Sequence, residues 1–260
     1  EAGDLAVEAW SGDTMRPKTW PQCRDFAVYI GGPNPALRDE QPYSQAHYDA
    51  VCERFGNPTV LDQYETVFID SITVAARLCL QWCKGQPQAQ SDRTGKPDTR
   101  GAYGLHGQEM IAWLTHWQHT RNKNIWFVGI LDEKVDDFNR KVFVPQIDGS
   151  KTALELPGIV DQVITLADMV SGDTRYRAFV NHTLNEWGYP AKDRSGRLDA
   201  IEEPHLGRLM DKILKPAKPA VDRLDYVCPE PDSSKDSTTE PTSRHANPMM
   251  AQSTEQGTPL

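Results

Sequence analysis

Asp70 is the residue best placed to do chemistry, because it ends a short apolar run (residues 67–69, VFI) and directly precedes Ser71. The run predicts a fully buried β-strand. In parallel α/β sheets ligands bind outside the carboxyl ends of the strands, so a carboxylate there would face a cleft. Such a carboxylate can hold Mg²⁺, which neutralises phosphate oxygens. Asp70 could equally be the N-cap of a following helix.

A second group of chemically capable residues is the basic cluster in residues 189–199, YPAKDRSGRLD. Lys192 and Arg194 are two apart, and on an extended segment they would project to the same side. Both could then reach one anionic group, and Arg could do so bidentately. The alternative is a solvated turn in which the cations pair with Asp193 and Asp199.

The elements that must position these residues alternate between apolar runs and amphipathic segments. Strands are predicted at 26–30, 64–70, 124–131, 160–169 and 175–181, and helices at 44–55, 71–83 and 107–120. A polar loop is expected over 84–101. Continuous apolar strands alternating with helices predict an α/β fold with a mostly parallel sheet and helices on both faces.

Composition narrows the class of protein. The chain has 260 residues, 38% of them hydrophobic, which suits one α/β domain over residues 1–225. Residues 226–260 are polar and acidic and predict a disordered C-terminal tail. No apolar run approaches the roughly 18 residues that a membrane span needs. The net charge of −9 means that any nucleic-acid contact must come from a local basic patch.

The five cysteines indicate a reducing compartment. They follow no disulfide or zinc spacing, and Cys79 and Cys83 lie one helical turn apart inside an apolar segment. We therefore expect a cytoplasmic protein.

Several segments in order resemble RecA-like ATPases of the AAA-type P-loop superfamily, and more narrowly the phage-encoded ATP-binding proteins of single-strand annealing and recombination. VFIDSIT resembles their Walker B strand, and NIWFVGILDEK resembles the next strand. NEWGYPAKDRSGRLD resembles their most distinctive stretch, with a K-x-R-x-G pattern at Lys192, Arg194 and Gly196. The resemblance covers roughly residues 60–205.

This resemblance implies a RecA-like P-loop core and roles for individual residues. Asp70, with Ser71 beside it, would hold Mg²⁺ and ATP. Lys192 and Arg194 would be fingers that enter the ATP site of a neighbouring subunit and stabilise the transferring phosphoryl group. A finger acting in trans requires a homo-oligomer, a ring or a filament. The localisation implied is the cytoplasm of a bacterial host, with a phage or prophage as the source.

A further catalytic candidate, Glu1, and a further ATP-binding candidate, Glu133, follow from the same resemblance. In RecA-like proteins the second strand ends in an acidic stretch whose Glu orients the attacking water, and Glu1 in EAGDL could be that residue. The strand over 124–131 is followed by Asp132 and Glu133, where the family places a sensor of the γ-phosphate. Relatives often carry Gln there, so Glu133 departs from the pattern.

The phosphate-binding loop of the family is missing from the sequence. No G-x-x-x-x-G-K-[ST] occurs, and the nearest pieces are GGPNP (31–35) and DGSKT (148–152). DGSKT lacks the upstream glycine and does not follow a buried strand, so its context is wrong. We expect the chain to be truncated before Glu1, lacking the first strand and the Walker A loop, and to be inactive as an ATPase by itself.

Two loops are expected to contact single-stranded DNA, because RecA-like proteins bind it after the Walker B helix and after the following strand. Acids are interspersed in both loops, so the electrostatic signal is mild. Tyr103 and Phe138 are the aromatic residues available for base stacking. The basic residues concerned are Arg93, Lys96, Arg100, Lys134, Arg140, Lys141 and Lys151.

Three functions remain open on the sequence. The first is an oligomeric RecA-like ATPase of phage DNA recombination or annealing. The second is an interaction module without a P-loop that docks on a recombinase or a single-strand-binding protein. The third is a metal-dependent nuclease that uses Asp70 and Asp132.

Overall fold

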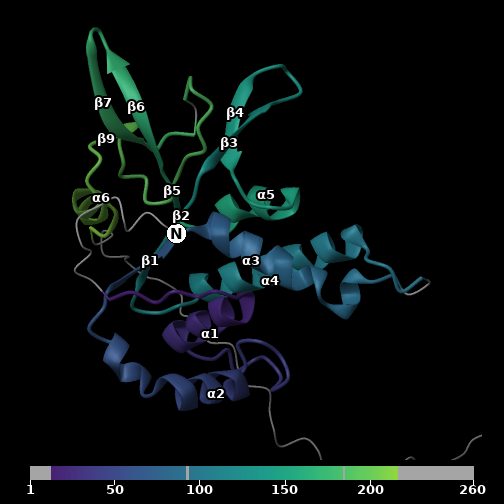
Figure 1. Ribbon diagram of the computed structural model, residues 1–260. Coiled ribbons are helices and arrows are strands. Elements are labelled where there is room, and N and C mark those ends of the chain that lie inside the picture. Colours follow the sequence, from purple (N-terminus) through teal and green to yellow (C-terminus); the bar gives the residue numbers. More distant parts are fainter. Residues whose placement is uncertain (1–12, 92–93, 184, 216–260) are drawn as a thin grey trace, which may run out of the picture. The chain divides into compact units, whose positions relative to one another are not determined.

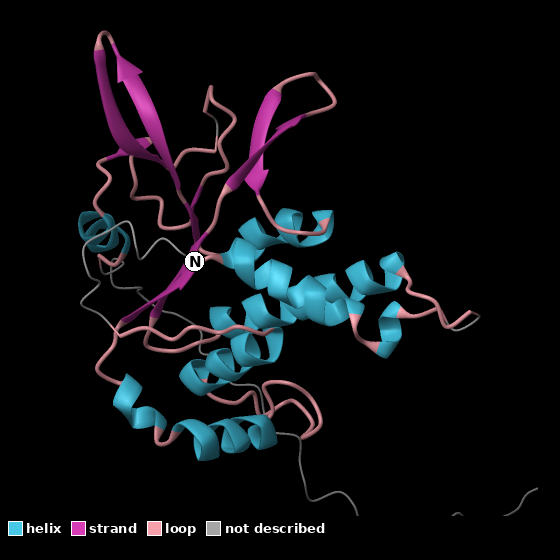
Figure 2. Cartoon of the chain, viewed as in Figure 1, coloured by secondary structure: helices cyan, strands magenta, loops and turns pink. Residues whose placement is uncertain are grey.

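The computed structural model describes residues 13–91, 94–183 and 185–215 (Figures 1 and 2). The predicted tail, 226–260, and the end of the predicted core lie outside these ranges. The elements, in chain order, are α1 (Trp20–Gly31), α2 (Gln45–Phe55), the 3₁₀ turn η2 (Pro58–Leu61), β1 (Thr66–Asp70), α3 (Ile72–Lys84), the 3₁₀ turn η3 (Pro87–Ala89), α4 (Thr99–Gln118), β2 (Asn124–Val128), β3 (Leu131–Val135), β4 (Lys141–Pro145), α5 (Ser150–Ile159), β5 (Gln162–Val163), β6 (Thr165–Ser171), β7 (Thr174–Val180), β8 (Lys192–Asp193), β9 (Ile201–Glu202) and α6 (Leu206–Ile213).

The strand predicted over 26–30 is wrong, because these residues belong to helix α1. Thr19 caps α1 by accepting a hydrogen bond from the Gln22 N–H, and a proline follows in the first turn. Trp20, Cys23 and Ala27 are buried, and their spacing of three and four residues places them on one helical face. The strong helix start therefore outweighs the β-propensity of the apolar run.

The helices predicted over 44–55 and 71–83 are confirmed as α2 and α3. Ser44 and Ser71 are their N-caps, each accepting a backbone N–H with its hydroxyl oxygen. Helix α4 begins at Thr99, earlier than the predicted 107 and inside the predicted loop. The glycines of its first turns obscured this start, although Gly101 serves packing: a Cβ there would lie 2.2 Å from the Gln88 carbonyl oxygen.

Strands β1 and β2 form a parallel pair that matches part of the predicted sheet. Val67 and Ile69 of β1 pack against the main hydrophobic core on one face. On the other face Phe68 is 45% exposed and its ring stacks on Trp126 at 6.2 Å. The predicted full burial of this strand is therefore wrong, since only alternate side chains reach the core.

The other strand pairings in the described ranges are antiparallel, so the mostly parallel sheet is not what this part of the chain forms. β3 and β4 form one hairpin, β6, β7 and β9 form a three-stranded sheet, and β5 pairs with β8. The apolar run predicted as one strand over 124–131 divides at Gly129, where the backbone passes close to α3. A Cβ at Gly129 would lie 2.9 Å from a methyl carbon of Ile72.

Two hydrophobic clusters stabilise these elements. The larger joins α1, α3 and α4 with one face of β1 and β2, and it contains the fully buried Trp20, Met110 and Leu114. The smaller lies under β6 and β7, where Trp187 and Tyr189 cover small side chains. Among the described residues, no helix combines the length and the apolar character needed to cross a membrane.

Candidate functional site

At the junction of β1 and α3, one residue caps the helix and another presents an exposed carboxylate, whereas the sequence allowed Asp70 to do either. Asp70 ends β1 and is exposed. The N-cap of α3 is Ser71, whose hydroxyl oxygen accepts the Val74 N–H at 3.3 Å. The interpretation of Asp70 as a helix cap is therefore wrong. Within the described ranges its carboxylate has no hydrogen-bond or ion-pair partner, which leaves both oxygens available for a ligand.

A polar hollow of about 170 Å³ lies beside the first turns of α3. It is lined by Thr73, Arg77, Asp132, Gln146, Ile147 and Asp148. Thr73 and Arg77 share one face of α3, and the Gln146 side-chain N–H donates to Asp132 at 3.1 Å. Apart from Asp132, sequence reasoning missed these residues. The positions of Thr73 and Arg77, three and seven residues after Asp70, were the available signal.

Glu133 does not end the strand that pairs with β1. β2 ends at Val128, and Asp132 and Glu133 lie inside β3 of the following hairpin. There Glu133 forms an ion pair with Lys141 at 2.7 Å. The sensor position inferred for Glu133 thus falls on the side of a hairpin, because the chain leaves the parallel pair earlier than the apolar run suggested.

Lys192 reaches the end of helix α5. Its Nζ donates to the carbonyl oxygens of Pro157 at 2.6 Å and Val160 at 2.7 Å. The last carbonyls of a helix have no intrahelical partner and carry partial negative charge, so an ammonium group stabilises them. Lys192 is also the first residue of β8, whose backbone pairs with β5.

Arg194 meets a different partner from Lys192. One of its guanidinium nitrogens lies 2.7 Å from the Asp161 carboxylate, and both side chains are mostly exposed, at 68% and 70%. An ion pair with this exposure contributes little to stability.

Asp193 organises the loop between these cations and α6. Its carboxylate accepts hydrogen bonds from the Ser195 N–H and hydroxyl and from the backbone N–H groups of Arg197 and Leu198. Partial burial raises the pKa of this carboxyl, but the hydrogen bonds from Ser195 and Leu198 outweigh it, so the net pKa is lowered. The carboxylate is therefore an internal anchor and the predicted surface ion pair of Asp193 with the cations is not formed.

Arg197 turns toward the end of helix α6. Its guanidinium donates to the carbonyl oxygen of Ile213 at 2.8 Å and also to that of Lys215. Asp199, the other predicted ion-pair partner in this segment, binds Lys212 instead.

The hairpin β3–β4 presents most of the second predicted DNA-contacting group. Phe138 at its tip is 78% exposed, and the Arg140 guanidinium lies 5.2 Å from the ring centroid. Arg140 also pairs with Asp136 at 2.7 Å. Hydrogen bonds from the backbone N–H and side chain of Arg140 lower the pKa of Asp136. An exposed aromatic ring flanked by a guanidinium is a suitable surface for stacking a nucleic-acid base.

The remaining predicted residues are scattered or undescribed. Glu1 and Arg93 lie outside the described residues. Lys96 lies in the turn between Gln90 and Pro97, and Arg100 is exposed in the first turn of α4. Lys134 is exposed on β3, and the backbone of Lys151 belongs to α5.

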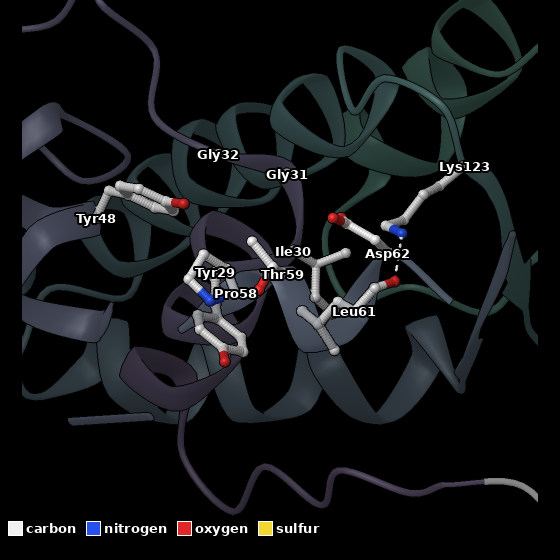
Figure 3. A pocket seen from close by; sticks show the side chains of 10 residues that line it. All are labelled: Tyr29, Ile30, Gly31, Gly32, Tyr48, Pro58, Thr59, Leu61, Asp62 and Lys123. Atoms are coloured by element: carbon white, nitrogen blue, oxygen red, sulfur yellow. Dashed lines mark hydrogen bonds between the residues drawn. The ribbon is translucent and has the colours of Figure 1, made fainter. Parts of the chain in front are cut away.

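The two glycine-rich pieces do not form a phosphate cradle. Gly31 and Gly32 end helix α1 and line a hollow of about 280 Å³, across from Lys123 (Figure 3). The Lys123 ammonium is committed to the carbonyl oxygens of Leu61 and Tyr64, both at 2.8 Å. A helix carboxyl end carries partial negative charge, which disfavours phosphate.

DGSKT begins helix α5, with Gly149 as the N-cap at φ 83°. It follows β4, an antiparallel hairpin strand, rather than a parallel strand of a nucleotide-binding sheet. The strand–loop–helix context of a phosphate loop is therefore absent from residues 141–159.

The profile of a family described as AAA domain matches residues 1–195, which is most of the chain. The chain belongs to this AAA domain family, and the match supports a nucleotide-binding, ATPase-like domain. No curated protein and no solved structure matches the chain.

ATP and Mg²⁺ are the ligands that AAA ATPases generally use, and Asp70 fits one part of that requirement. Mg²⁺ is usually bound by one or two carboxylates together with water and phosphate oxygens. Asp70, which is exposed at a parallel strand end and has no partner among the described residues, meets that description. In the described ranges no three His, Cys, Asp or Glu side chains gather as a metal cage.

Proposed function

We propose that this chain is the core of a RecA-like, phage-encoded protein that binds and hydrolyses ATP in DNA recombination or single-strand annealing in the bacterial cytoplasm. The observation that carries the proposal is Asp70: exposed, unpaired among the described residues, and placed at the carboxyl end of a parallel strand in an AAA-family chain. Asp70 does not line the polar hollow beside α3, but Thr73 and Arg77 of the helix that follows it do. This supports the proposal, because ligands of parallel sheets bind outside the carboxyl ends of the strands.

In this proposal Asp70 holds Mg²⁺, directly or through water. The metal would supply charge neutralisation at the phosphate oxygens. The segment 192–194 would bring positive charge to the ATP site of a neighbouring copy in a homo-oligomer, where it stabilises the transferring phosphoryl group. Ser71 starts helix α3 and thereby fixes the direction in which Asp70 leaves the sheet.

The proposal assigns the phosphate-binding loop to sequence outside these 260 residues, because no G-x-x-x-x-G-K-[ST] occurs among them. Among the described residues, the bare face of the parallel pair supports this assignment, since Phe68 there is 45% exposed and stacks on the partly buried Trp126. A strand–loop–helix unit laid on this face would bury both rings. We expect the 260-residue chain alone to bind ATP weakly in isothermal titration calorimetry; nanomolar binding would contradict this.

Single-stranded DNA is the proposed polymer partner, and the hairpin β3–β4 supports it. Phe138 offers a stacking surface, while Lys134, Arg140 and Lys141 supply positive charge around it. A recombinase or a single-strand-binding protein is a further expected partner of such a protein.

The test is hydrolysis by the full-length natural protein carrying Asp70→Asn. We expect kcat to fall by at least about 10²-fold, because the metal loses its carboxylate ligand. The unfolding temperature should stay unchanged, since Asp70 has no partner in the described fold.

Asp168→Asn is the matched control. Asp168 is another exposed carboxylate, on β6, and it pairs with Arg177, so its loss should leave turnover unchanged. Wild-type turnover in Asp70→Asn would contradict the proposal.

An interaction module without nucleotide is the second candidate, and the same bare face of β1 and β2 favours it. In that case Phe68→Ser in the full-length protein would abolish binding to a recombinase or single-strand-binding protein, while ATP would change nothing. The nuclease alternative gains no support, because Asp132 is bound to Gln146 and no three metal-binding side chains gather in the described residues.

A further inference from the structure

The hollow of about 280 Å³ at the carboxyl end of α1 has a chemistry that the proposed ATPase function does not use. Its walls combine an uncapped helix end, an exposed carboxylate and a tyrosine ring. We propose that this hollow binds an organic cation: a primary ammonium or guanidinium group, carried either by a free amine or by a lysine or arginine side chain.

The last turn of α1 leaves its carbonyl oxygens without backbone donors because of the residues that follow it. The helical partners of the carbonyls of residues 29–31 would be residues 33–35 (PNP), and the two prolines have no N–H. The Asn34 N–H donates to the Tyr43 carbonyl oxygen at 2.8 Å instead. Among the described residues no other donor reaches these three carbonyls. The helix end therefore keeps its partial negative charge, roughly half an elementary charge.

Gly31 and Gly32 expose this helix end to the hollow. Both line it, and because glycine has no side chain they do so with backbone atoms. A donor that enters the hollow therefore meets the end of α1 directly.

One ammonium group is already bound to carbonyl oxygens in this hollow. The Lys123 Nζ donates to the carbonyls of Leu61 and Tyr64, both at 2.8 Å (Figure 3). This wall thus shows the kind of contact that an entering ammonium can make with the end of α1. The charge of Lys123 is offset by the carboxylate of Asp62, which also lines the hollow, so the helix end leaves the sum negative.

The remaining walls suit a cation on an alkyl chain. Asp62 is exposed, and no described side chain binds its carboxylate. In Figure 3 the Asp62 carboxylate and the Tyr48 hydroxyl extend toward one another from opposite sides of the hollow. A tyrosine ring attracts a cation through its quadrupole, and Ile30 and Leu61 offer apolar contact to methylene groups. An anion would meet the same carboxylate and the same helix end, which disfavour it.

The test is a titration of the 260-residue chain with 1,4-diaminobutane at low salt, followed by NMR of the backbone amides. We expect saturable shifts at residues 29–32, 48 and 59–62, with a Kd of about 1 mM. The control is 1,4-butanediol, which has the same carbon chain without the charges and should cause no saturable shift. An equal response to the two compounds, or no saturable response to the diamine, would overturn the proposal.

Substitutions locate the binding. Asp62→Asn should weaken binding of the diamine about 3- to 5-fold, because one partly solvated charge is lost. Glu65→Gln removes an exposed carboxylate that does not line the hollow and should change the Kd less than about 2-fold. Equal weakening in the two variants would reduce the binding to general attraction by an acidic protein and overturn the site.

Tyr48 separates the contribution of the ring from that of the fold. Tyr48→Leu should weaken binding at least about 3-fold, whereas Tyr48→Phe keeps the ring and should bind like the wild type. The unfolding temperature of both variants is measured alongside, so that a loss of binding is compared between folded proteins. Undiminished binding by Tyr48→Leu would remove the ring from the site.

A second ligand distinguishes the two sources of the cation. Lysine blocked at both backbone ends (Nα-acetyl-lysine methylamide) presents its ammonium as a protein side chain does. Tighter binding of blocked lysine than of 1,4-diaminobutane identifies a protein side chain as the source, and the reverse order identifies a free amine. None of these measurements involves ATP, so the cation site and the ATPase function stand or fall separately.

Discussion

Two cationic regions of this chain use their charges differently. In the loop over residues 192–198 two of the three cations bind backbone carbonyls at helix ends, and the Asp193 carboxylate binds backbone N–H groups. In the hairpin β3–β4 the exposed cations Arg140 and Lys141 pair with carboxylates, Asp136 with a side chain 21% exposed and Glu133 with one 51% exposed. The loop contacts satisfy groups that have no other partner, whereas the hairpin contacts can be exchanged for water or phosphate.

This difference separates charge that shapes the fold from charge available to a ligand. Net charge and local basic density do not reveal it, because both regions contain interspersed acids and bases. The distinguishing feature is the chemical nature of the partner. A backbone carbonyl at a helix end holds its cation in place, while a solvated carboxylate on a hairpin does so weakly.

The largest expected effect is the loss of stability caused by a substitution in the loop over residues 192–198. Asp193→Ala removes the acceptor of four hydrogen bonds and should lower the free energy of unfolding by about 2–4 kcal/mol, measured by urea denaturation. Glu133→Ala in the hairpin is the contrasting change: its ion pair with Lys141 is exposed on both sides, so it should cost less than about 1 kcal/mol. Equal costs would remove the distinction between the two regions.

Phe138→Ala tests whether the hairpin β3–β4 contributes to ligand binding rather than to stability. We expect its affinity for oligo-dT, followed by fluorescence anisotropy, to fall by about 1–3 kcal/mol through the loss of base stacking. Stability should change by less than about 0.5 kcal/mol, because the ring is almost fully exposed. Unchanged affinity would show that the hairpin tip is not a DNA-binding surface.

Acidification should weaken the loop through Asp193. Its pKa is lowered in the folded state, so its contribution to stability is present above the ordinary value of 3.8 and is lost as the pH falls through the folded pKa. Asp193→Asn cannot titrate and should therefore show a smaller loss of stability between pH 5 and pH 2 than the wild type. Parallel stability curves for the two proteins would argue against this carboxylate as the anchor.

The smallest effect is expected for Arg140→Ala. Its ion pair with Asp136 is exposed, so stability should change by no more than about 0.5 kcal/mol. If Arg140 contacts a DNA phosphate, the slope of log affinity against log salt should become shallower by about 0.7. Arg177→Ala, whose cation lies outside the hairpin, should leave the slope unchanged.

The β1–α3 unit could be predicted from the sequence because its signals are local. The apolar run, the cap at Ser71 and the periodicity of α3 lie within 20 residues and agree with one another. The secondary structure of residues 26–30 could not be predicted from these residues alone, since a short apolar run fits either a strand or a buried helix. The deciding signal was the cap at Thr19, seven residues upstream.

The surroundings of the candidate site depended on contacts distant in sequence. Lys192 meets a carbonyl 35 residues away, and Arg197 meets one 16 residues away, so a K-x-R-x-G pattern cannot show which cation stays free. The hollow beside α3 forms only because Asp132 of the hairpin and residues 146–148 after it lie against Thr73 and Arg77 of that helix. The place of Asp70 at a strand end could be predicted because the apolar run before it is a local signal, whereas Gln146 and Asp148 carried no comparable signal.

Because Ser71 caps α3, the side chain at position 70 has no structural contact among the described residues, although its backbone belongs to the β1–β2 pair. A library randomised at this codon should therefore yield folded protein for most amino acids, and only a growth or turnover selection should enrich aspartate. In the proposed function the residue that caps the helix and the residue that binds the metal are therefore neighbours in the sequence, and the side chain at position 70 can be varied without disturbing the cap.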